Sequence, residues 1–484
     1  MDGPVPRLVE LDEYRWEIPT GERAGMRVPG VLFSSRKLLE GVEHDPSLEQ
    51  LANVATLPGI QRSALAMPDI HFGYGFPVGG VAAFDLAEGV VSPGGIGYDI
   101  NCGVRLLRTG LTVAEVRPRL KSLMDALYRE VPSGVGSKGG TALSGAQMDE
   151  VLAGGAAWAV AQGHGRPEDL TVQEEEGRMR RADPAKVGDS ARKRGLRQLG
   201  TLGSGNHFLE VQAVDEVFFP EFAGALGLVP ESVVVMLHTG SRGLGHQVAT
   251  DYIERMNRRL ASEGTTLVDR QLSCAPIASD DGQAYLDAMA AGANFAWANR
   301  QLITEGVRAA FRSSFAGANG SADVSVVYDI AHNMAKEEVH TVDGQPRAVL
   351  VHRKGATRAF PPGREEVPAS YRSFGQPVLI PGDMGTASYV LAGLDSALER
   401  SFGSSCHGAG RRLSRHAAAR QFRYDEVTRN LSMKGIVVRS ASHEGVTEEA
   451  PGAYKDVDEV VRVAEGAGLT RRVARLRPLG VVKG

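Results

Sequence analysis

A single glycine-rich stretch, from Ser92 to Gly103, constrains the fold of this chain more than any other segment. Its sequence is S-P-G-G-I-G-Y-D-I-N-C-G, and its glycines favour a tight turn because glycine adopts backbone conformations that other residues avoid. The turn ends with Asp99 and Cys102, whose carboxylate and thiolate can point at one cation. Taken alone, the stretch is more typical of a buried cysteine in a structural turn, so a metal site needs further ligands elsewhere in the chain.

Three later segments each place a histidine at one end of a predicted strand, namely His207, His238 and His332. Side chains at strand ends are where ligands are commonly bound on α/β scaffolds. Together with Asp99 and Cys102, the histidines make a set of one carboxylate, one thiolate and three imidazoles. This coincidence favours a metal site over a structural turn.

The number of predicted ligands bears on how many metal ions the site holds. Five ligands are more than one catalytic zinc uses, so the set allows two metals if the Cys102 thiolate bridges them. Ligand softness alone indicates zinc as the metal.

Two glycine-rich turns indicate chemistry on phosphate groups. His407 lies in the turn S-S-C-H-G-A-G-R, ahead of an arginine-rich helix, where a neutral imidazole could attack a phosphorus atom and form a phosphoramidate. The turn H-T-G-S-R-G at 238–243 joins a strand to a helix and is suited to phosphate, with Arg242 adding positive charge.

The remaining pattern predicts a mixed α/β (α+β) fold, with a single large domain over residues 1–484 whose sheets and helices surround a dinuclear metal centre. Helices are predicted at 46–56, 113–131, 147–162, from the 239–245 turn to about 260, at 280–315 and after Asn333. Strands are predicted at 104–110, from 207 onward, at 233–237, 324–328, 348–352 and 377–380, with a hairpin at 78–85 and 90–91. Loops are predicted around Asp69 and His71 and at 353–358, a solvated connector at 174–197, and a docked chain end at 476–484.

Composition and missing motifs exclude several classes of protein. The chain has 54 Lys and Arg against 58 Asp and Glu, so its net charge does not favour nucleic acid. A nucleic-acid partner would have to bind a local basic surface. Three scattered cysteines argue against a disulfide framework, and we expect a cytoplasmic protein with no signal peptide and no membrane partner. We find no G-x-x-x-x-G-K-[ST], G-x-S-x-G, H-E-x-x-H or K-x-D-G motif, so a nucleotide enzyme here needs a different nucleophile.

Seven motifs, in order along the chain, resemble those of the RtcB-type RNA-splicing ligases, and the match runs from about residue 67 to the final residue. They are G-Y-D-I-N-C-G at 97–103, G-S-G-N-H-F at 203–208, H-T-G-S-R-G at 238–243, D-I-A-H-N at 329–333, P-G-D-M-G at 381–385, S-S-C-H-G-A-G-R at 404–411 and the terminal V-V-K-G. Seven motifs in the right order are far more specific than any one of them.

The resemblance implies an RtcB-like fold and a GTP-dependent RNA ligase. Such an enzyme joins an RNA 2′,3′-cyclic phosphate or 3′-phosphate end to a 5′-hydroxyl end, through a guanylylated histidine and an RNA 3′-guanylate, in tRNA splicing or RNA repair. The resemblance implies two Mn²⁺ ions rather than zinc, one held by Asp99, Cys102 and His207 and the other by Cys102, His238 and His332. The partners it implies are GTP, RNA in the form of tRNA halves or broken ends, and archease as an activator.

The resemblance also assigns roles to further residues, with His407 as the guanylylated nucleophile and Asp69 as a helper when water opens a cyclic phosphate or in a later step. RNA phosphates would be held by Arg242, Arg411 and Arg415. The expected GTP or GMP contacts are Asn206, His207, Phe208, Leu209, Glu210, His332, Asn333, Pro381, Gly382, Asp383, Met384, Ser388, His407, Gly408, Ala409, Gly410, Tyr454 and Lys483.

Two alternatives from other classes stay open. A dinuclear metal-dependent phosphoesterase could act on RNA ends without GTP, using the same five ligands but leaving His407 and Lys483 without a role. An RNA-binding protein with a structural metal is the weaker alternative, because structural sites rarely need an open dinuclear centre.

Overall fold

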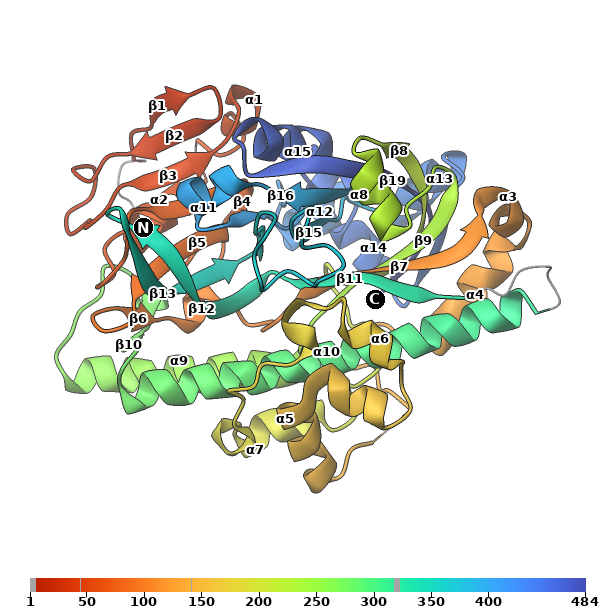
Figure 1. The fold of residues 1–484 in the computed structure, drawn as a ribbon, viewed down its shortest axis with the longest axis horizontal. Coiled ribbons are helices and arrows are strands. Elements are labelled where there is room, and N and C mark those ends of the chain that lie inside the picture. Colours follow the sequence, from red (N-terminus) through yellow and green to blue (C-terminus); the bar gives the residue numbers. More distant parts are fainter. Residues whose placement is uncertain (1–5, 44, 141, 317–322) are drawn as a thin grey trace.

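Two large β-sheets form the centre of the structure, and long helices lie against them (Figure 1). The computed structural model describes residues 6–43, 45–140, 142–316 and 323–484. One large sheet has seven strands and the other has eight, and two further sheets have two strands each. The mixed α/β class predicted from the sequence is confirmed.

Strand order defines each of the four sheets. The seven-stranded sheet has the order β1 (Val9–Asp12), β2 (Arg15–Ile18), β3 (Gly30–Phe33), β4 (Ala64–His71), β5 (Val78–Asp85), β13 (Gln345–Lys354) and β12 (Asn333–Val342). The eight-stranded sheet has the order β11 (Ser325–Ala331), β7 (Gly103–Thr112), β9 (Ser232–Thr239), β8 (Phe208–Val217), β19 (Thr470–Lys483), β16 (Ser388–Gly393) and β15 (Pro377–Ile380), with β18 (Val437–Ser440) beside β19. The small sheets pair β6 (Val90–Val91) with β10 (Ala275–Pro276) and β14 (Ala356–Arg358) with β17 (Ser404–Cys406).

The α-helices range from single turns to one of 35 residues. They are α1 (Arg36–Leu39), α2 (Ser47–Val54), α3 (Val113–Val116), α4 (Leu120–Glu130), α5 (Gly145–Ala161), α6 (Pro167–Leu170), α7 (Asp189–Gly195), α8 (Pro220–Leu226), α9 (Arg242–Ser262), α10 (Asp280–Ser314), α11 (Asp395–Ser401), α12 (Arg415–Gln421), α13 (Tyr424–Met433), α14 (His443–Glu448) and α15 (Val457–Gly466). Within the described ranges, none is long and apolar enough to cross a membrane.

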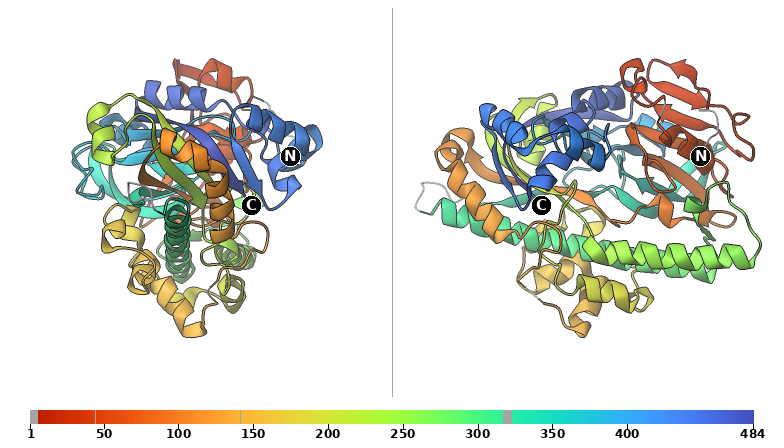
Figure 2. Two further views of the ribbon diagram at one scale, coloured as in Figure 1. Left: turned by 90° about the vertical axis from the view of Figure 1, so that its right-hand side faces the viewer. Right: turned by 180° about the vertical axis from the view of Figure 1, so that it is seen from behind.

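The longest helix, α10, runs beneath the sheets, with α9 beside it and α5 and α7 beyond it (Figure 1). The end-on view in Figure 2 shows α10 enclosed between the sheets and these outer helices. Its middle is rich in alanine, which favours helix and leaves room for close packing on several sides. The predicted helices ending near 260 and spanning 280–315 are confirmed, and α10 forms a rigid base under the eight-stranded sheet.

Antiparallel pairing brings four strand ends to one edge of the eight-stranded sheet. β7 pairs antiparallel with both β9 and β11, and β8 pairs antiparallel with β9. The register places Gly103 opposite Thr239 and Ala331, and Phe208 opposite His238. The starts of β7 and β8 therefore lie beside the ends of β9 and β11, which is the edge where the predicted ligands occur.

The helix predicted after Asn333 is wrong, because this segment is β12, which pairs antiparallel with β13. Its charged residues hid the strand pattern, since Lys336 and Glu338 point to the buried side. Ion pairs with Glu174 at 2.8 Å and Arg353 at 2.6 Å stabilise these buried charges. A lysine and a glutamate at inward positions are unusual without such partners, so the sequence alone suggested a helix.

The prediction of a polar loop at 353–358 is also wrong, because most of this segment belongs to β13 and β14. Arg353 lies near the end of β13 and Arg358 lies in β14, and both guanidinium groups are buried against carboxylates. The connector at 174–197 is only partly solvated, because Glu174 is buried and its carboxylate accepts the backbone N–H of Ala331 at 2.7 Å. These arginines therefore stabilise the fold around β11 and β12 and are not free to bind anions.

Two further local predictions need correction, and one holds. Asp69 and His71 lie in the last residues of β4 rather than in a loop. The predicted hairpin is absent from the described chain, since β5 pairs with β4 and β13 whereas β6 pairs with β10. The chain end is docked as predicted, because β19 runs to Lys483 and pairs with β8.

Candidate active site

The five predicted metal ligands meet at one edge of the eight-stranded sheet. Cys102 directly precedes β7 and His207 directly precedes β8, whereas His238 lies near the end of β9 and His332 directly follows β11. Asp99 lies in the turn just before Cys102. Ligands far apart in the sequence therefore converge because antiparallel neighbours place one strand's start beside the next strand's end.

Cys102 belongs to two groups of ligand atoms, in each of which the atoms lie within 4.8 Å of one another. One group is Asp99, Cys102 and His207, and the other is Cys102, His238 and His332. Cys102 Sγ lies 3.5 Å from His207 Nε2 and 3.3 Å from His238 Nε2. Asp99 Oδ2 lies 2.8 Å from His207 Nε2, and His238 Nε2 lies 3.2 Å from His332 Nε2. This geometry suits two cations that share one thiolate.

The chemistry of these side chains fits bound cations. His207 Nδ1 donates to the Leu202 carbonyl at 3.0 Å, which leaves Nε2 free to act as a ligand. Burial lowers the pKa of His238 and of His332 well below the ordinary value, so both rings are neutral and keep a lone pair for a metal. Burial, and then the nearby Asp99 carboxylate, raise the pKa of the Cys102 thiol, so its thiolate needs a positive charge close by.

A buried ion network fixes the turn that carries the ligands. Arg300 of α10 donates to the carbonyl and the side-chain oxygen of Asn101 at 2.8 and 2.9 Å, and it also pairs with Asp329. Arg105 and Trp297 donate to the same Asp329 carboxylate. Asn101 has a φ of 51°, a left-handed conformation that asparagine tolerates better than most residues. The network therefore links α10 and β11 to the place where the chain turns towards the metal ligands.

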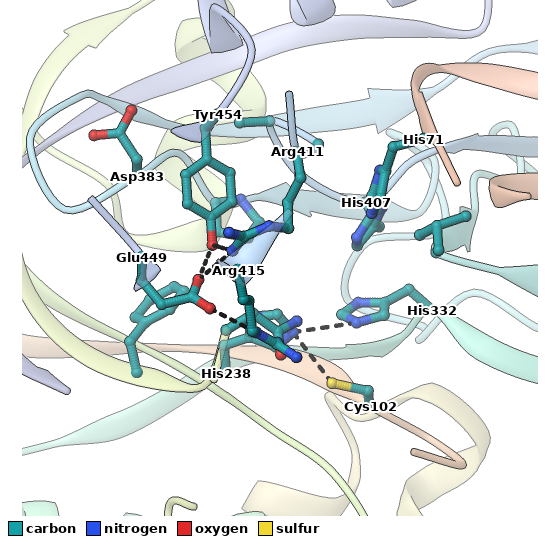
Figure 3. A pocket seen from close by; sticks show the side chains of 18 of the residues that line it. His71, Cys102, His238, His332, Asp383, His407, Arg411, Arg415, Glu449 and Tyr454 are labelled. Carbon is teal, nitrogen blue, oxygen red and sulfur yellow. Dashed lines mark hydrogen bonds and ion pairs between the residues drawn. The ribbon is translucent and has the colours of Figure 1, made fainter. Parts of the chain in front are cut away.

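His407 lies beside the second ligand group, and Asp69 holds its ring. His407 Nδ1 donates to Asp69 Oδ2 at 2.6 Å, and the backbone N–H groups of His407 and Gly408 donate to the same oxygen at 2.9 and 3.3 Å. The His407 ring centroid is 4.8 Å from that of His332 (Figure 3). Burial alone would raise the pKa of Asp69, but the His407 ring and these hydrogen bonds lower it overall. The ionised carboxylate fixes Nδ1 as the protonated nitrogen and leaves Nε2 free.

Asp69 lies behind His407 as seen from the cavity. Its side chain is fully buried behind His407, and it contacts the histidine rather than the open cavity. Asp69 is thus placed to act through His407 and not directly on water or RNA.

A cavity of about 600 Å³ opens in front of His407. Leu209 and Ser388 do not line it, because the Leu209 side chain packs in the apolar core on the other face of the sheet and the buried Ser388 hydroxyl accepts the Gly382 N–H. His207 adjoins the cavity through its ligand group without lining it. The other residues expected to contact GTP line it, namely Asn206, Phe208, Glu210, His332, Asn333, Pro381, Gly382, Asp383, Met384, His407, Gly408, Ala409, Gly410, Tyr454 and Lys483.

One end of this cavity carries ionisable groups with shifted pKa values. Burial raises the pKa of Glu210 to about 8 and lowers the pKa of Lys483 to about 8. Burial also raises the pKa of Asp383. Lys483 Nζ lies 5.9 Å from the centroid of the Phe208 ring. A lysine donor and a carboxyl group near an aromatic ring are suited to a flat polar heterocycle.

The three arginines expected to hold RNA phosphates have different surroundings. Arg411 and Arg415 line the cavity, and both pair with Glu449 at 3.0 Å. Arg242 begins α9 with a φ of 55°, and its Nε donates to the Thr201 hydroxyl at 3.3 Å. Arg242 does not line the cavity and lies on the side of the first ligand group.

Sequence reasoning gave no site role to two buried residues of the cavity wall, although one of them, Lys354, lies in the loop predicted at 353–358. Glu449 follows α14, and its carboxylate accepts hydrogen bonds from Tyr454 and Arg415 (Figure 3). Lys354 ends β13, and its ammonium group donates to the Phe76 carbonyl at 2.8 Å. Neither residue belongs to a glycine-rich turn, so no local pattern in the sequence marks it.

The fold and the site define a mixed α/β protein whose sheet edge carries two metal-ligand groups beside a histidine-bearing cavity. The chain matches the family model described as tRNA-splicing ligase RtcB over residues 50–484. It is 57% identical over 477 residues to the tRNA-splicing ligase RtcB of Thermococcus kodakarensis and 54% identical over 477 residues to that of Archaeoglobus fulgidus, with 99% of each chain covered in both cases. It is 56% identical over 438 residues to the RNA-splicing ligase RtcB of Mycobacterium bovis, which covers 90% of this chain and 100% of the relative.

The chain therefore belongs to the RtcB family of tRNA-splicing ligases. The resemblance drawn from the seven motifs is confirmed.

Proposed function

We propose that this chain, an RNA ligase by its family, joins RNA 2′,3′-cyclic phosphate or 3′-phosphate ends to 5′-hydroxyl ends, with GTP as co-substrate and Mn²⁺ as the metal. One observation carries the mechanism, which is the position of His407 between the buried Asp69 carboxylate and the second ligand group. This arrangement holds the Nδ1 proton of His407 on Asp69, so that Nε2 would be the nitrogen that attacks.

In the first step, the free Nε2 of His407 attacks the α-phosphorus of GTP. The P–N bond forms as the bond to pyrophosphate breaks, and the electron pair leaves with pyrophosphate. Asp69 accepts the Nδ1–H bond throughout and stabilises the positive charge that the ring acquires. Two Mn²⁺ ions, held by the two groups that share Cys102, would supply Lewis-acid charge for the phosphate oxygens.

The later steps return His407 to its starting state. A 2′,3′-cyclic phosphate end is first opened by one water molecule to a 3′-phosphate and a free 2′-hydroxyl. An oxygen of the RNA 3′-phosphate then attacks the phosphorus of the guanylate, and the P–N bond breaks with its electron pair returning to Nε2 of the histidine. The 5′-hydroxyl oxygen of the second strand then attacks the 3′-phosphorus and displaces GMP. Arg411 and Arg415, which line the cavity, would hold RNA phosphates, and so would Arg242 on the side of the other ligand group.

The phosphoesterase alternative uses the ligand groups but gives no role to the Asp69–His407 pair or to the docked Lys483. The ligase proposal uses all of these residues, so it accounts for more of the site.

The test is covalent labelling. Protein incubated with Mn²⁺ and GTP labelled at the α-phosphate should carry the label on a denaturing gel, and the labelled protein should seal RNA with a 3′-phosphate to RNA with a 5′-hydroxyl. The adduct should be labile in acid and stable in alkali, as a phosphoramidate is. Hydrolysis of RNA ends with no label on the protein would favour the phosphoesterase.

We also propose that residues 1–484 act as one catalytic domain. Its support is the path of the chain at His332, where β11 of the eight-stranded sheet continues into β12 of the seven-stranded sheet beside the cavity. The nature of the RNA ends, activation by archease and a cytoplasmic location stay predictions.

A further inference from the structure

The proposed reaction gives no role to Glu449, a buried carboxylate in the cavity wall. Only 1% of its surface is exposed. Burial would raise its pKa, but Lys483, Arg411 and Arg415 lower it to about 2. Glu449 is therefore ionised at neutral pH, and a buried charge of this kind persists only where partners stabilise it.

Four side chains converge on this carboxylate. Arg411 Nη1 lies 3.0 Å from Oε2, and Arg415 Nε lies 3.0 Å from Oε1. The Tyr454 hydroxyl donates to Oε2, and Lys483 Nζ lies 3.9 Å from the same oxygen. Two carboxylate oxygens offer about four lone-pair sites, and Arg411, Arg415 and Tyr454 take up most of them, whereas Lys483 is attracted by charge at 3.9 Å without a hydrogen bond. Glu449 thus acts on a ligand through its partners and not by direct contact.

The partners of Glu449 come from separate parts of the chain. Tyr454 follows the 3-10 turn Pro451–Ala453, and Lys483 ends β19. Arg411 lies between His407 and α12, and Arg415 is the first residue of α12. Without a shared anion, the buried Lys483, the partly buried Arg411 and the more exposed Arg415 would face one another. One carboxylate therefore sets where these side chains point.

We propose that Glu449 is a positioning residue that holds Lys483 and Tyr454 against the nucleobase and so sets the preference of the site for guanine over adenine. The inference rests on the proposed function, because the nucleobase site is part of it. Guanine carries acceptors at O6 and N7, whereas adenine carries an amino donor at position 6. An ammonium group only donates, so it pairs with guanine O6 and opposes the adenine amino group.

The charge of Glu449 matters for this discrimination as well as its position. Burial lowers the pKa of Lys483, while Glu449 and, more weakly, Glu210 raise it, and Arg415 and Arg411 lower it. Loss of the Glu449 charge would make a neutral lysine more common. A neutral amine can accept a hydrogen bond from adenine, so discrimination should fall even where the side chain keeps its place.

The first experiment measures covalent labelling of the full-length protein with α-labelled GTP and ATP in Mn²⁺. Glu449→Gln removes the charge and keeps the size of the side chain. We expect the KM for GTP to rise about 10- to 100-fold and the ratio of kcat/KM for GTP over ATP to fall about tenfold, the scale of one hydrogen bond to a charged group. Glu449→Asp keeps the charge and should rescue part of this selectivity.

A matched control separates this role from structural support. Glu338 is also a buried carboxylate, and it pairs with Arg353 at 2.6 and 2.9 Å and with His340 at 2.8 Å. It does not line the cavity. Glu338→Gln should lower the melting temperature without changing the ratio of GTP to ATP use.

A double-mutant cycle tests whether Glu449 acts through Lys483. If it does, Glu449→Gln should add little further loss of selectivity in a Lys483→Met background. Additive losses in the cycle, or a Glu449→Gln protein with the wild-type GTP to ATP ratio, would overturn the inference. If Glu449→Gln does not fold, Glu449→Asp decides, because unchanged GTP binding and selectivity in that variant would contradict the positioning role. A wild-type protein that takes no label from GTP would instead refute the proposed function, whatever Glu449 does.

Discussion

The two ends of the site are built in different ways. At one end are the strand-end ligands, which are Asp99, Cys102, His207, His238 and His332. At the other end is the Glu449 cluster, which is Glu449 with Arg411, Arg415, Tyr454 and Lys483. The strand-end ligands take their places from sheet register. In the Glu449 cluster, register places only Lys483, which lies opposite Phe208, and the side chains meet through charge pairing with one carboxylate.

The difference shows which kind of site a sequence can reveal. A ligand at a strand end carries a local signal, because an apolar run stops at a histidine or a glycine-rich turn. A carboxylate such as Glu449 carries none, since it gathers its partners from three segments that are distant from one another in the sequence. His407 lies between the two ends, and substitutions at and around it separate their contributions.

The largest effect is expected from His407→Ala. This change removes the proposed nucleophile and leaves both the strand-end ligands and the Glu449 cluster unaltered. Covalent GMP attachment should be abolished, while Mn²⁺ binding stays at the wild-type level because His407 belongs to neither ligand group. Labelling with α-labelled GTP and metal analysis of the same sample measure the two properties. A labelled band in this variant would contradict the assignment of His407 as the nucleophile.

Asp69→Asn should have the next largest effect, lowering the rate of guanylylation by about 10²- to 10⁴-fold. An amide cannot stabilise the imidazolium and can turn its N–H group towards His407 Nδ1, which leaves the wrong nitrogen protonated. Single-turnover labelling measures the rate. Asp215→Asn, a change at a partly exposed carboxylate paired with Arg475, is the control and should leave it unchanged. A wild-type rate in Asp69→Asn would show that the pair is only structural.

Deleting Lys483 and Gly484 tests the Glu449 cluster. The KM for GTP should rise about tenfold, since the cavity loses its donor for guanine acceptors. The ratio of kcat/KM for GTP over ATP should fall for the same reason. Folding should change little, because the rest of β19 stays paired with β8. Guanylylation kinetics with both nucleotides, and a melting curve, measure these effects. Equal kinetics in the full-length and shortened chains would identify Lys483 as a terminal residue without function.

Arg242→Ala should give the smallest effect and should act on one step only. RNA joining should fall about tenfold, the scale of one charged hydrogen bond, whereas self-guanylylation should stay unchanged because Arg242 does not line the nucleotide cavity. Assays of the two steps on one preparation make the comparison. Equal loss in both steps would place Arg242 at the nucleotide.

Most of the strand-end ligands could be predicted from the sequence, whereas much of the wall of the cavity could not. The sequence predicted His207, His238 and His332 at strand ends and Cys102 at the end of a glycine-rich turn, and the register brings them together. It failed at β12, where Lys336 and Glu338 break the apolar alternation but are paired inside the protein. It also missed Glu449, whose partners become neighbours only when the chain is folded.

Local pattern also misplaced residues that were recognised as important. Asp69 was expected in a loop and near water, but it lies near the end of a strand, behind His407. Arg358 was expected in a loop, but it lies in β14 and pairs with Glu175 at 3.0 Å in the interior. Such errors share a cause, because the sequence does not show which charged side chains find a partner at long range.

The shared thiolate is tested most directly by the number of Mn²⁺ ions bound by the wild-type protein and by Cys102→Ser. Cys102 belongs to both ligand groups, and a serine hydroxyl is not ionised at neutral pH and cannot bridge as a thiolate does. Metal analysis after dialysis should find two ions per wild-type chain, and a marked loss of metal together with most of the activity in Cys102→Ser. Full Mn²⁺ stoichiometry with normal turnover in that variant would contradict the shared thiolate.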